Sequence, residues 1–388
     1  MLKAGPKIYL WGWYGHENSG DDALLTEMCL MLSKISGNVR VIVQISGEGR
    51  LPELPEFVQV HRLVQWFKGS IYLNKIITIL RSNALVFGGG STMADVNPAR
   101  MKGLRQKYHI CRLAKLKGIP IVFSALGLGP LVSEEGAKIA KRTLDLADVV
   151  EVRDGASYEL CKKIGVSSEV IQAFDPSVLM PEQFSIDLPQ LAKSGPTSVG
   201  ISLAKSSGTV DNSDASQEAK ISNLVSAIKK VAAVKPLRVA PIEMCGDKID
   251  GERQLCQRLM DELKDVCEVE LIPYDPDPAK MLQRLSALDL IIAERLHAAL
   301  YAYTLGINFA VVPYHSKCTA LADDVKLPDV CRLAPEMPQE QIVRLLECCM
   351  AASEQCKPTL SLEKARKLSQ AGQNAVVQKL KTLLGTNL

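Results

Sequence analysis

The sequence predicts an α/β protein of two domains, each built on a parallel β-sheet that is wrapped by helices. The chain has 388 residues, which exceeds the usual size of a single domain. Short apolar runs rich in Val, Ile and Leu alternate with helical patterns, as expected of parallel strands buried on both faces. A stretch rich in Pro and Ser, residues 176–197, interrupts the alternation before a second series begins.

The first series of strands occupies about the first 180 residues. Its expected strands are IYLWGW, VRVIVQI, ALVFGGG, IPIVFSALG and VVEVRD. Between them lie helical patterns such as YHICRLAKLKG, which ends at Gly118 with Pro120 just beyond. We therefore expect an N-terminal domain over residues 1–180 and a crossover linker over residues 181–197.

The second series begins with SVGISLA and continues with PLRVAPIEM, CEVELIPY, LDLIIAE and INFAVVPY. A helical tail starts near Pro338, so residues 198–388 are expected to form a C-terminal domain with additional helices. Ligands of open α/β sheets bind beyond the carboxyl ends of the strands. The chemistry is therefore expected in the loops after these strands, in a cleft between the domains.

The composition argues against several classes of protein. The net charge is +3 and Lys and Arg occur along the whole chain, which is too weak a signal for a nucleic-acid partner. The sequence has neither an uninterrupted apolar stretch of about 18 residues nor an export signal, so no transmembrane segment is expected. The eleven cysteines include no CxxC pair, which predicts buried, reduced thiols and a cytoplasmic location.

The loop GHENSGDD, residues 15–22, joins the first strand to a helix. A turn of this kind presents backbone N–H groups to an anion, but its glycines fit neither a P-loop nor a dinucleotide fingerprint. Asp21 and Asp22 would also repel a phosphate. Spacing alone favours Asp21 as the N-cap of the helix over Asp21 as a catalytic carboxylate.

Glycines also follow a later strand, in VFGGGSTMADVNP. Gly89 and Gly90, followed by Ser91, would permit positive φ angles and close backbone approach to a ligand. A tight turn without a ligand is an equally good explanation. The segment SALGLGP, residues 124–130, repeats the pattern after the next strand.

Cationic side chains follow three other strands. In VVEVRDGAS, Arg153 and Asp154 alone predict a local surface ion pair, with Asp154 as a helix cap. In LIIAERLHAALYAY, Arg295 and His297 arrive together, a pairing that suits anion binding and proton transfer better than a core histidine. In VVPYHSKC, Lys317 follows Tyr314 and His315, and either neutralises a phosphate or is a solvated loop lysine.

Taken as an ordered set, these motifs resemble the polysaccharide pyruvyl transferase family. The segments that carry the resemblance cover about residues 7–320 and are GWYGHENSGDDALL, LVFGGGS, GLGP, VRD, DPS, RLHAALYAYTLGI and VPYHSK. The resemblance implies a GT-B-like fold, with two Rossmann-like domains whose parallel sheets face across a cleft. It also implies transfer of the pyruvyl group of phosphoenolpyruvate to two hydroxyls of a sugar, which forms a cyclic ketal and releases phosphate.

The resemblance also implies roles for the residues. His297 is the expected general acid or base, with Asp21 as the partner carboxylate from the acceptor side. The expected clamp for phosphoenolpyruvate comprises Arg295, with Lys317 and Arg153. The loops expected to line the acceptor side contain Asn18, Gly20, Gly89, Gly90 and Ser91. No metal or other cofactor is expected, and the acceptor is a polysaccharide unit or a polyprenyl-diphosphate-linked sugar, met in the cytoplasm at the inner face of the membrane.

Two residues depart from the family pattern. Glu294 stands where many relatives have Ser or Thr, and Ala125 stands where Gly or a polar residue is common. A nucleotide-sugar glycosyltransferase of GT-B type is the alternative enzyme, with Glu243 as the candidate carboxylate for the ribose. An inactive, sugar-binding relative is the other alternative, which Glu294 leaves open.

Overall fold

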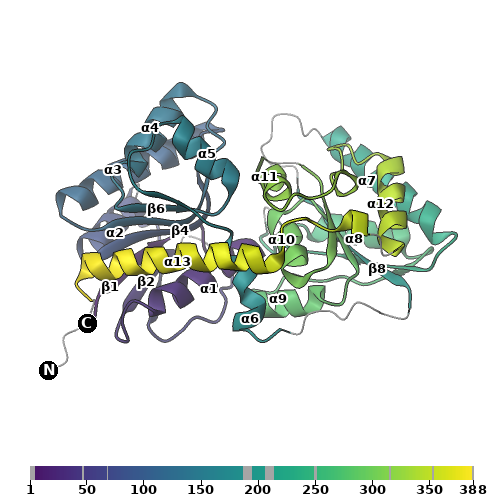
Figure 1. Cartoon of the computed structure of the whole chain (residues 1–388), viewed down its shortest axis with the longest axis horizontal. Coiled ribbons are helices and arrows are strands. Elements are labelled where there is room, and N and C mark those ends of the chain that lie inside the picture. Colours follow the sequence, from purple (N-terminus) through teal and green to yellow (C-terminus); the bar gives the residue numbers. More distant parts are fainter. Residues whose placement is uncertain are drawn as a thin grey trace. The chain divides into compact units, whose positions relative to one another are not determined.

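The computed structural model describes residues 5–45, 48–67, 69–186, 195–205, 214–248, 251–313, 316–351 and 354–386. The chain folds into two compact units (Figure 1). The first unit comprises Met1–His16, Asp21–Pro176 and Arg366–Leu388. The second unit comprises Glu17–Gly20 and Ser177–Ala365.

The first unit is built on a seven-stranded parallel sheet with the order β3-β2-β1-β4-β5-β6-β7. The strands are β1 Lys7–Trp11, β2 Arg40–Ile45, β3 Val58–Arg62, β4 Ala84–Met93, β5 Ile121–Leu128, β6 Val149–Val152 and β7 Val170–Gln172. The order reverses between β1 and β4, because the chain first builds outward to β3 and then returns to the other side of β1. Ligands of such sheets bind at this switch point, beyond the carboxyl ends of the strands.

Helices cover both faces of this sheet. One face packs against α1 (Ser19–Ser33) and α13 (Leu362–Leu384), which share a core with β1 and β2 (Figure 1). The other face packs against α2 (Ser70–Leu80), α3 (Pro98–Leu116), α4 (Glu134–Leu144) and α5 (Gly155–Lys163). The strands between the two edges of the sheet are buried on both sides, which explains their continuous apolar runs, whereas the edge strands β3 and β7 are partly exposed.

The second unit repeats this plan with a five-stranded parallel sheet of order β10-β9-β8-β11-β12. Its strands are β8 Thr197–Ser202, β9 Leu237–Pro241, β10 Glu268–Val269, β11 Leu290–Ala293 and β12 Asn308–Val311. Its helices are α6 Met180–Gln183, α7 Asp214–Ala232, α8 Arg253–Leu263, α9 Pro278–Leu285, α10 Leu296–Leu305, α11 Ser316–Asp324 and α12 Gln339–Met350. The 3₁₀ segments are Pro176–Leu179, Asp329–Cys331 and Glu354–Cys356. The order reverses between β8 and β11, so each unit has its own switch point.

The predicted α/β architecture with two Rossmann-like units is confirmed, but the last helix belongs elsewhere than the sequence pattern places it. Residues from Arg366 onward join the first unit, where Val376, Val377 and Leu380 enter the core beside α1. Amphipathic periodicity shows that a helix has an apolar face, but not which sheet that face covers. Within the expected linker, α6 ends at Gln183 and β8 begins at Thr197, while residues 187–194 lie outside the described residues.

The cysteines are free thiols, and eight of the eleven are buried. Burial raises the pKa of Cys29 and Cys161 to about 12, so both are protonated at neutral pH. A protonated, buried thiol packs as a small hydrophobe and is a poor nucleophile. In the part of the chain that the structure describes, no helix is both long and apolar enough to cross a bilayer.

A buried ion pair holds β11 of the second unit to α7. The carboxylate of Glu294 accepts hydrogen bonds from Lys220 Nζ at 2.8 Å and from the backbone N–H of Ala204 at 2.7 Å. Both charged side chains are almost completely buried. The Cys318 thiol donates to the Glu294 carbonyl at 3.2 Å. The residue that departs from the family pattern therefore contributes its charge to the interior of the second unit.

Removing one partner of this pair should strongly destabilise the second unit. Glu294→Ala leaves the Lys220 ammonium buried without its carboxylate, which should cost about 3–5 kcal/mol. For a unit of this size that loss should lower the thermal midpoint by roughly 10 °C, measured by circular dichroism. The double variant Lys220→Met/Glu294→Leu should recover most of the loss, because no charge remains to be desolvated.

The exposed pair of Lys162 and Glu159 provides the control. The Lys162 Nζ and Glu159 Oε1 atoms are 3.0 Å apart and both side chains face solvent, so Lys162→Ala should leave the thermal midpoint almost unchanged. Equal midpoints for Glu294→Ala and Lys162→Ala would show that the buried pair does not stabilise the unit.

Candidate active site

The second unit brings an arginine and a histidine together at the N-terminus of α10. Arg295 is the N-cap residue of this helix and His297 lies in its first turn. Nine of the ten residues of α10 are buried, so the helix is held firmly in the unit. Because the positive end of the helix dipole adds to the charge of Arg295, this position favours a bound anion.

Glu252 holds Arg295 in place. The Nε–H of Arg295 donates to the carboxylate of Glu252, which is fully buried. The same carboxylate accepts the backbone N–H groups of Met244 at 2.8 Å and Cys245 at 3.2 Å. A carboxylate with three donors fixes the guanidinium in one orientation.

The charge of Glu252 depends on pH near neutrality. Burial raises the pKa of its carboxyl to about 7, and the neighbouring Arg295 opposes the rise. Sequence analysis missed this residue because GDKIDGERQ reads as an ordinary polar loop before a helix. The only feature of the sequence that sets Glu252 apart from other polar residues of this loop is its position just before α8.

Four residues of the N-terminal loop, Glu17–Gly20, belong to the second unit. The backbone N–H of Ser19 donates to the Met244 carbonyl at 2.9 Å, and Asn18 forms an antiparallel bridge with Cys245. The hydroxyl of Tyr301, on α10, donates to the Ser19 carbonyl at 2.9 Å. These bonds join the loop to the same helix that carries His297.

Gly20 lies directly against the imidazole of His297. A Cβ atom at Gly20 would be 2.0 Å from His297 Nδ1, so any other residue would displace the ring. The neighbouring Asn18 accepts the N–H of Gly20 on its side-chain oxygen at 3.1 Å. In the NSG segment, Asn18 thus caps α1, and Gly20 leaves the space that the His297 ring occupies.

The capping role predicted for Asp21 is therefore corrected. Helix α1 begins at Ser19, so Asp21 and Asp22 lie within its first turn rather than at its N-cap. There they still face the positive end of the helix dipole. The cap itself is Asn18, three residues earlier than spacing predicts.

In the first unit, Asp21 lies beside Gly89 and Gly90, which belong to β4 itself and not, as the sequence pattern predicts, to a loop after the strand. A Cβ atom at Gly90 would be 3.5 Å from the Asp21 Oδ1 atom, and Gly89 and Gly90 have φ angles of 71° and 83°. Burial and the charges of Cys29 and Asp21 raise the pKa of Tyr14, whose hydroxyl donates to the Gly88 carbonyl. Asp21, in the first turn of α1, and the two glycines of β4 are thus neighbours.

Arg153 pairs with a residue that sequence analysis did not choose. Its Nη1 atom is 2.8 Å from Asp175 Oδ2, and both side chains are buried. Asp154 instead caps α5 by accepting the N–H of Ser157 at 2.7 Å, which confirms the cap and overturns the local surface pair. The true partner is the aspartate of the DPS segment, which is distant in sequence but lies beyond the neighbouring strand.

The Arg153 guanidinium also reaches the carboxyl-terminal parts of β4 and β5. Its Nη2 atom is 3.5 Å from the Ser91 hydroxyl. A Cβ atom at Gly127 would be 3.3 Å from two of its nitrogens, so the glycine of GLGP permits the close approach. Ser91, Gly127, Arg153 and Asp175 therefore form one polar cluster at the carboxyl edge of the first sheet.

The remaining predicted residues are less informative. Lys317 lies in the first turn of α11 and is half-buried, while Tyr314 and His315 lie outside the described residues. The Glu243 carboxylate, the candidate for a ribose, is held by Arg253 at 2.6 and 3.0 Å and is buried. Among the described residues, no group of three or more His, Cys, Asp or Glu side chains is arranged to hold a metal ion.

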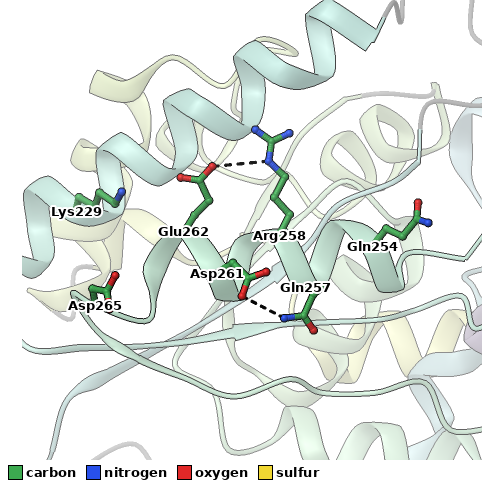
Figure 2. Close-up of a pocket in the computed structure, with 7 residues that line it drawn as sticks. All are labelled: Lys229, Gln254, Gln257, Arg258, Asp261, Glu262 and Asp265. Carbon is green, nitrogen blue, oxygen red and sulfur yellow. Dashed lines mark hydrogen bonds and ion pairs between the residues drawn. The ribbon is translucent and has the colours of Figure 1, made fainter.

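A polar depression on the surface of the second unit has none of the predicted site residues in its lining (Figure 2). It is lined by Lys229 of α7, by Asp265 just after α8, and by five residues of α8, namely Gln254, Gln257, Arg258, Asp261 and Glu262. Its charges are paired locally, because Arg258 contacts Glu262 at 3.8 Å and Glu218 at 2.5 Å. This depression is therefore not the candidate site.

The raised pKa of Glu252 predicts how stability should change with pH. Between pH 4.5 and pH 7 the folded protein keeps a proton on Glu252 that the unfolded chain loses. This contribution to stability is therefore complete below pH 4.5 and is lost as the pH rises to 7, by an amount on the order of 3 kcal/mol.

Glu252→Gln removes the titrating group and should flatten the stability curve over this window. The free energy of unfolding, measured by denaturant titration at several pH values, should be similar for the variant and the parent near pH 4.5, where Glu252 is also neutral. As the pH rises to 7, the parent should become the less stable of the two. Parallel curves would show that Glu252 has an ordinary pKa.

Comparisons with known proteins identify the family. The chain matches the family model described as polysaccharide pyruvyl transferase over residues 18–316. None of the curated proteins is detectably similar in sequence.

Solved structures show the same fold at low identity. The UDP-GlcNAc 2-epimerase from Methanocaldococcus jannaschii has 10% identity and a TM-score of 0.61, with 95% of this chain and 99% of that chain covered. The UDP-GlcNAc 2-epimerase from Neisseria meningitidis, bound to UDP-GlcNAc, has 12% identity and a TM-score of 0.59, with coverage of 97% and 99%. A lipopolysaccharide outer core galactosyltransferase has 10% identity and a TM-score of 0.54, with coverage of 98% and 99%.

At these identities the likeness concerns the fold alone, which is the GT-B-like arrangement that the sequence predicts. The family model, in contrast, covers most of the chain and includes both the NSGDD segment and the Arg-Leu-His segment. The chain therefore belongs to the polysaccharide pyruvyl transferase family.

Proposed function

We propose that this protein transfers the pyruvyl group of phosphoenolpyruvate to two hydroxyls of one sugar, forming a cyclic ketal and releasing phosphate. The observation that carries the proposal is the fixed pair of Arg295 and His297 at the N-terminus of α10, in a chain of this family. The acceptor is a sugar of a polysaccharide or of a polyprenyl-diphosphate-linked precursor. Phosphoenolpyruvate is the donor, and the proposal requires no cofactor.

The reaction needs one proton donor and one proton acceptor. Protonation of the methylene carbon turns it into a methyl group and leaves an oxocarbenium-like centre at the neighbouring carbon. The first sugar hydroxyl attacks this centre, the bond to the phosphate oxygen breaks, and the second hydroxyl closes the ketal. Of the two hydroxyl protons, one replaces the proton given to carbon and the other leaves with the phosphate.

The donor carries a carboxylate and a phosphate, so its site should be cationic. Arg295 is oriented through its Nε–H by Glu252, and in this proposal its terminal nitrogens face the donor. Lys317, after the next strand, supplies a second positive charge, and the N-terminus of α10 adds its dipole. Arg153 is the further clamp residue, held by Asp175.

His297 is the proposed acid for the methylene carbon. Its Nε2 atom is shielded from solvent and its ring packs against Gly20, so the orientation of the imidazole is determined before substrate binds. Positioned proton transfer of this type contributes about 10²–10⁴-fold to rate. The histidine also lies edge-on to Tyr301, with ring centroids 6.1 Å apart, which restricts its rotation further.

Asp21 is the proposed base for the acceptor hydroxyl. It lies beside Gly90 in the first unit, and the nearby backbone of Gly89 and Gly90 could approach a sugar closely. Ser91 and Asn18 are the neighbouring hydrogen-bonding side chains of the acceptor loops. A carboxylate can accept a hydrogen bond from a neutral sugar hydroxyl, but it would repel the carboxylate and phosphate groups of the donor.

The test of the whole proposal is release of phosphate from phosphoenolpyruvate with a panel of sugar acceptors. We expect phosphate release that depends on one class of acceptor, with a ketal detected by mass spectrometry. Release of a nucleoside diphosphate from a sugar nucleotide, with no turnover of phosphoenolpyruvate, would instead identify a glycosyltransferase.

Removing the His297 side chain, or displacing its ring by a substitution at Gly20, should lower the rate of ketal formation in both cases. His297→Ala should abolish ketal formation, with a loss of at least about 10²-fold in kcat. Gly20→Ala forces the ring aside and should lower kcat/KM about 10²-fold, because small displacements of a catalytic group have effects of this size.

Gly37→Ala is the matched control for Gly20→Ala. Gly37 is exposed and a Cβ atom there meets nothing within 4 Å, so activity should be unchanged. Normal phosphate release by Gly20→Ala would show that the position of the His297 ring does not matter for the reaction.

Asp21→Asn separates a catalytic role from a structural one. Because Asn18 is the cap of α1, the substitution should leave the thermal midpoint within about 2 °C, while the loss of the base should lower kcat at least about 10²-fold. Loss of stability without a selective loss of kcat would give Asp21 a purely structural role.

A further inference from the structure

The first unit exposes an apolar surface along α2 and the segment that precedes it. We define this apolar surface by the residues Val64, Trp66, Phe67, Leu73, Ile77 and Leu80. Trp66 is 82% exposed and Phe67 is 61% exposed, which is unusual for large aromatic side chains. Leu73, Ile77 and Leu80 are spaced by four and three residues, so they lie on one face of the helix.

The two parts of the apolar surface are held together by backbone contacts. The N–H of Trp66 donates to the Ser70 hydroxyl at 3.1 Å, and the N–H of Ser70 donates to the Phe67 carbonyl at 3.0 Å. These bonds keep the aromatic residues at the start of α2. Grouped apolar side chains of this kind indicate an interaction surface, whereas scattered ones do not.

The surrounding segment is basic and contains few acidic residues. Residues 57–133 contain eleven lysines and arginines but one acidic residue, Asp95, so their formal charge is +10 in a chain whose total is +3. Asp95 is buried and accepts the hydroxyl and backbone N–H of Ser133. Two of these cations, Arg105 and Lys115, pair with Glu135 and Asp148 outside the segment, which leaves an excess of positive charge within it.

The cations and the apolar surface lie on the same side of the first unit. Helices α2 and α3 pack against each other and share one core with the same face of the sheet (Figure 1). The Nζ atoms of Lys75 on α2 and Lys107 on α3 are 4.4 and 5.8 Å from the centroid of the same Trp11 ring. Exposed cations of this side include Arg81, next to α2, and Arg100, Lys102 and Arg112 on α3.

We propose that this surface of α2 and α3 docks the protein on an anionic lipid bilayer. Exposed aromatic and aliphatic side chains insert at the boundary between headgroups and acyl chains, and neighbouring Lys and Arg side chains bind anionic headgroups. A nucleic acid would also attract the cations and stack on Trp66 and Phe67. It would offer nothing to the aliphatic stripe of Leu73, Ile77 and Leu80, which favours lipid.

The direction of the strands relates this surface to the proposed acceptor loops. Strand β3 is parallel to β2, and through β2 to β1 and β4, so its carboxyl end lies at the sheet edge where Asp21 and Gly90 are found. Val64, Trp66 and Phe67 follow β3 at that edge. If the proposed function holds, docking at this edge would bring the acceptor loops close to a lipid-linked sugar. This last step of the inference rests on the proposed function.

The test measures binding of the full chain to sedimented vesicles, without donor or acceptor, so its failure is independent of the proposed activity. The probes are vesicles of phosphatidylcholine alone and of phosphatidylcholine mixed with phosphatidylglycerol. We expect at least tenfold tighter binding to the anionic vesicles, weakened by added salt as exposed charges are screened. A blue shift of tryptophan fluorescence on binding should accompany it, and Trp66→Phe should remove most of this shift.

Two double variants divide the apolar and basic contributions. Trp66→Ser/Phe67→Ser should weaken binding to anionic vesicles at least tenfold. Arg100→Ser/Lys102→Ser should weaken it less and reduce its dependence on salt. The matched control is Val234→Ser/Lys235→Ser, which changes one exposed apolar residue and one exposed cation of the second unit and should bind like the parent.

Circular dichroism spectra and thermal midpoints identify any variant that fails to fold, and for such a variant Trp66→Gln/Phe67→Gln replaces the serine pair. Equal binding to neutral and anionic vesicles would overturn the proposal. So would unchanged vesicle binding by the folded aromatic variants, or binding to single-stranded DNA with none to vesicles.

Discussion

The contact between the backbone of Gly20 and the imidazole of His297 is the constraint on which the candidate site depends. Because of this contact, the loop near the N-terminus can carry only a glycine at position 20 if the His297 ring is to keep its position. Because the loop is tied to Met244 and Cys245 and to Tyr301 on α10, the histidine is positioned by main-chain structure rather than by a single side chain. Such preorganisation costs nothing at the moment of reaction.

Buried ion pairs serve different purposes at adjacent positions of this chain. Glu294 directs its charge to Lys220 in the interior, whereas Arg295 is held by Glu252 next to the N-terminus of α10. A buried pair brings little net stability, because desolvation of the two charges offsets their attraction. Its value at Arg295 is geometric, since a guanidinium with one fixed edge can present the other edge to an anion. Glu294 thus need not signal a lost activity.

The sequence predicts the elements well and the partners of charged residues poorly. Parallel strands buried on both faces leave apolar runs such as LIIA, which can be recognised locally, and their carboxyl ends then locate Arg295 and His297. The partner of Arg153 could not be predicted, because Asp175 meets it only after the sheet has formed, whereas Asp154 is the nearer residue in sequence. Glu252 has no motif at all, and the sheet that α13 covers depends on packing rather than on periodicity.

The loop GHENSGDD shows how two explanations of one segment can both hold. Glu17–Gly20 belongs to the second unit and supports His297, while Asp21 and Asp22 begin the first turn of α1 in the first unit. The constraint on Gly20 is therefore steric, whereas the constraint on Asp21 and Asp22 is electrostatic. An acidic pair would repel a doubly anionic donor, and the nearest cations of the proposed donor site, Arg295 and Lys317, come from the other half of the chain. This difference in charge is the reason for proposing Asp21 on the side of the sugar and Arg295 on the side of the donor.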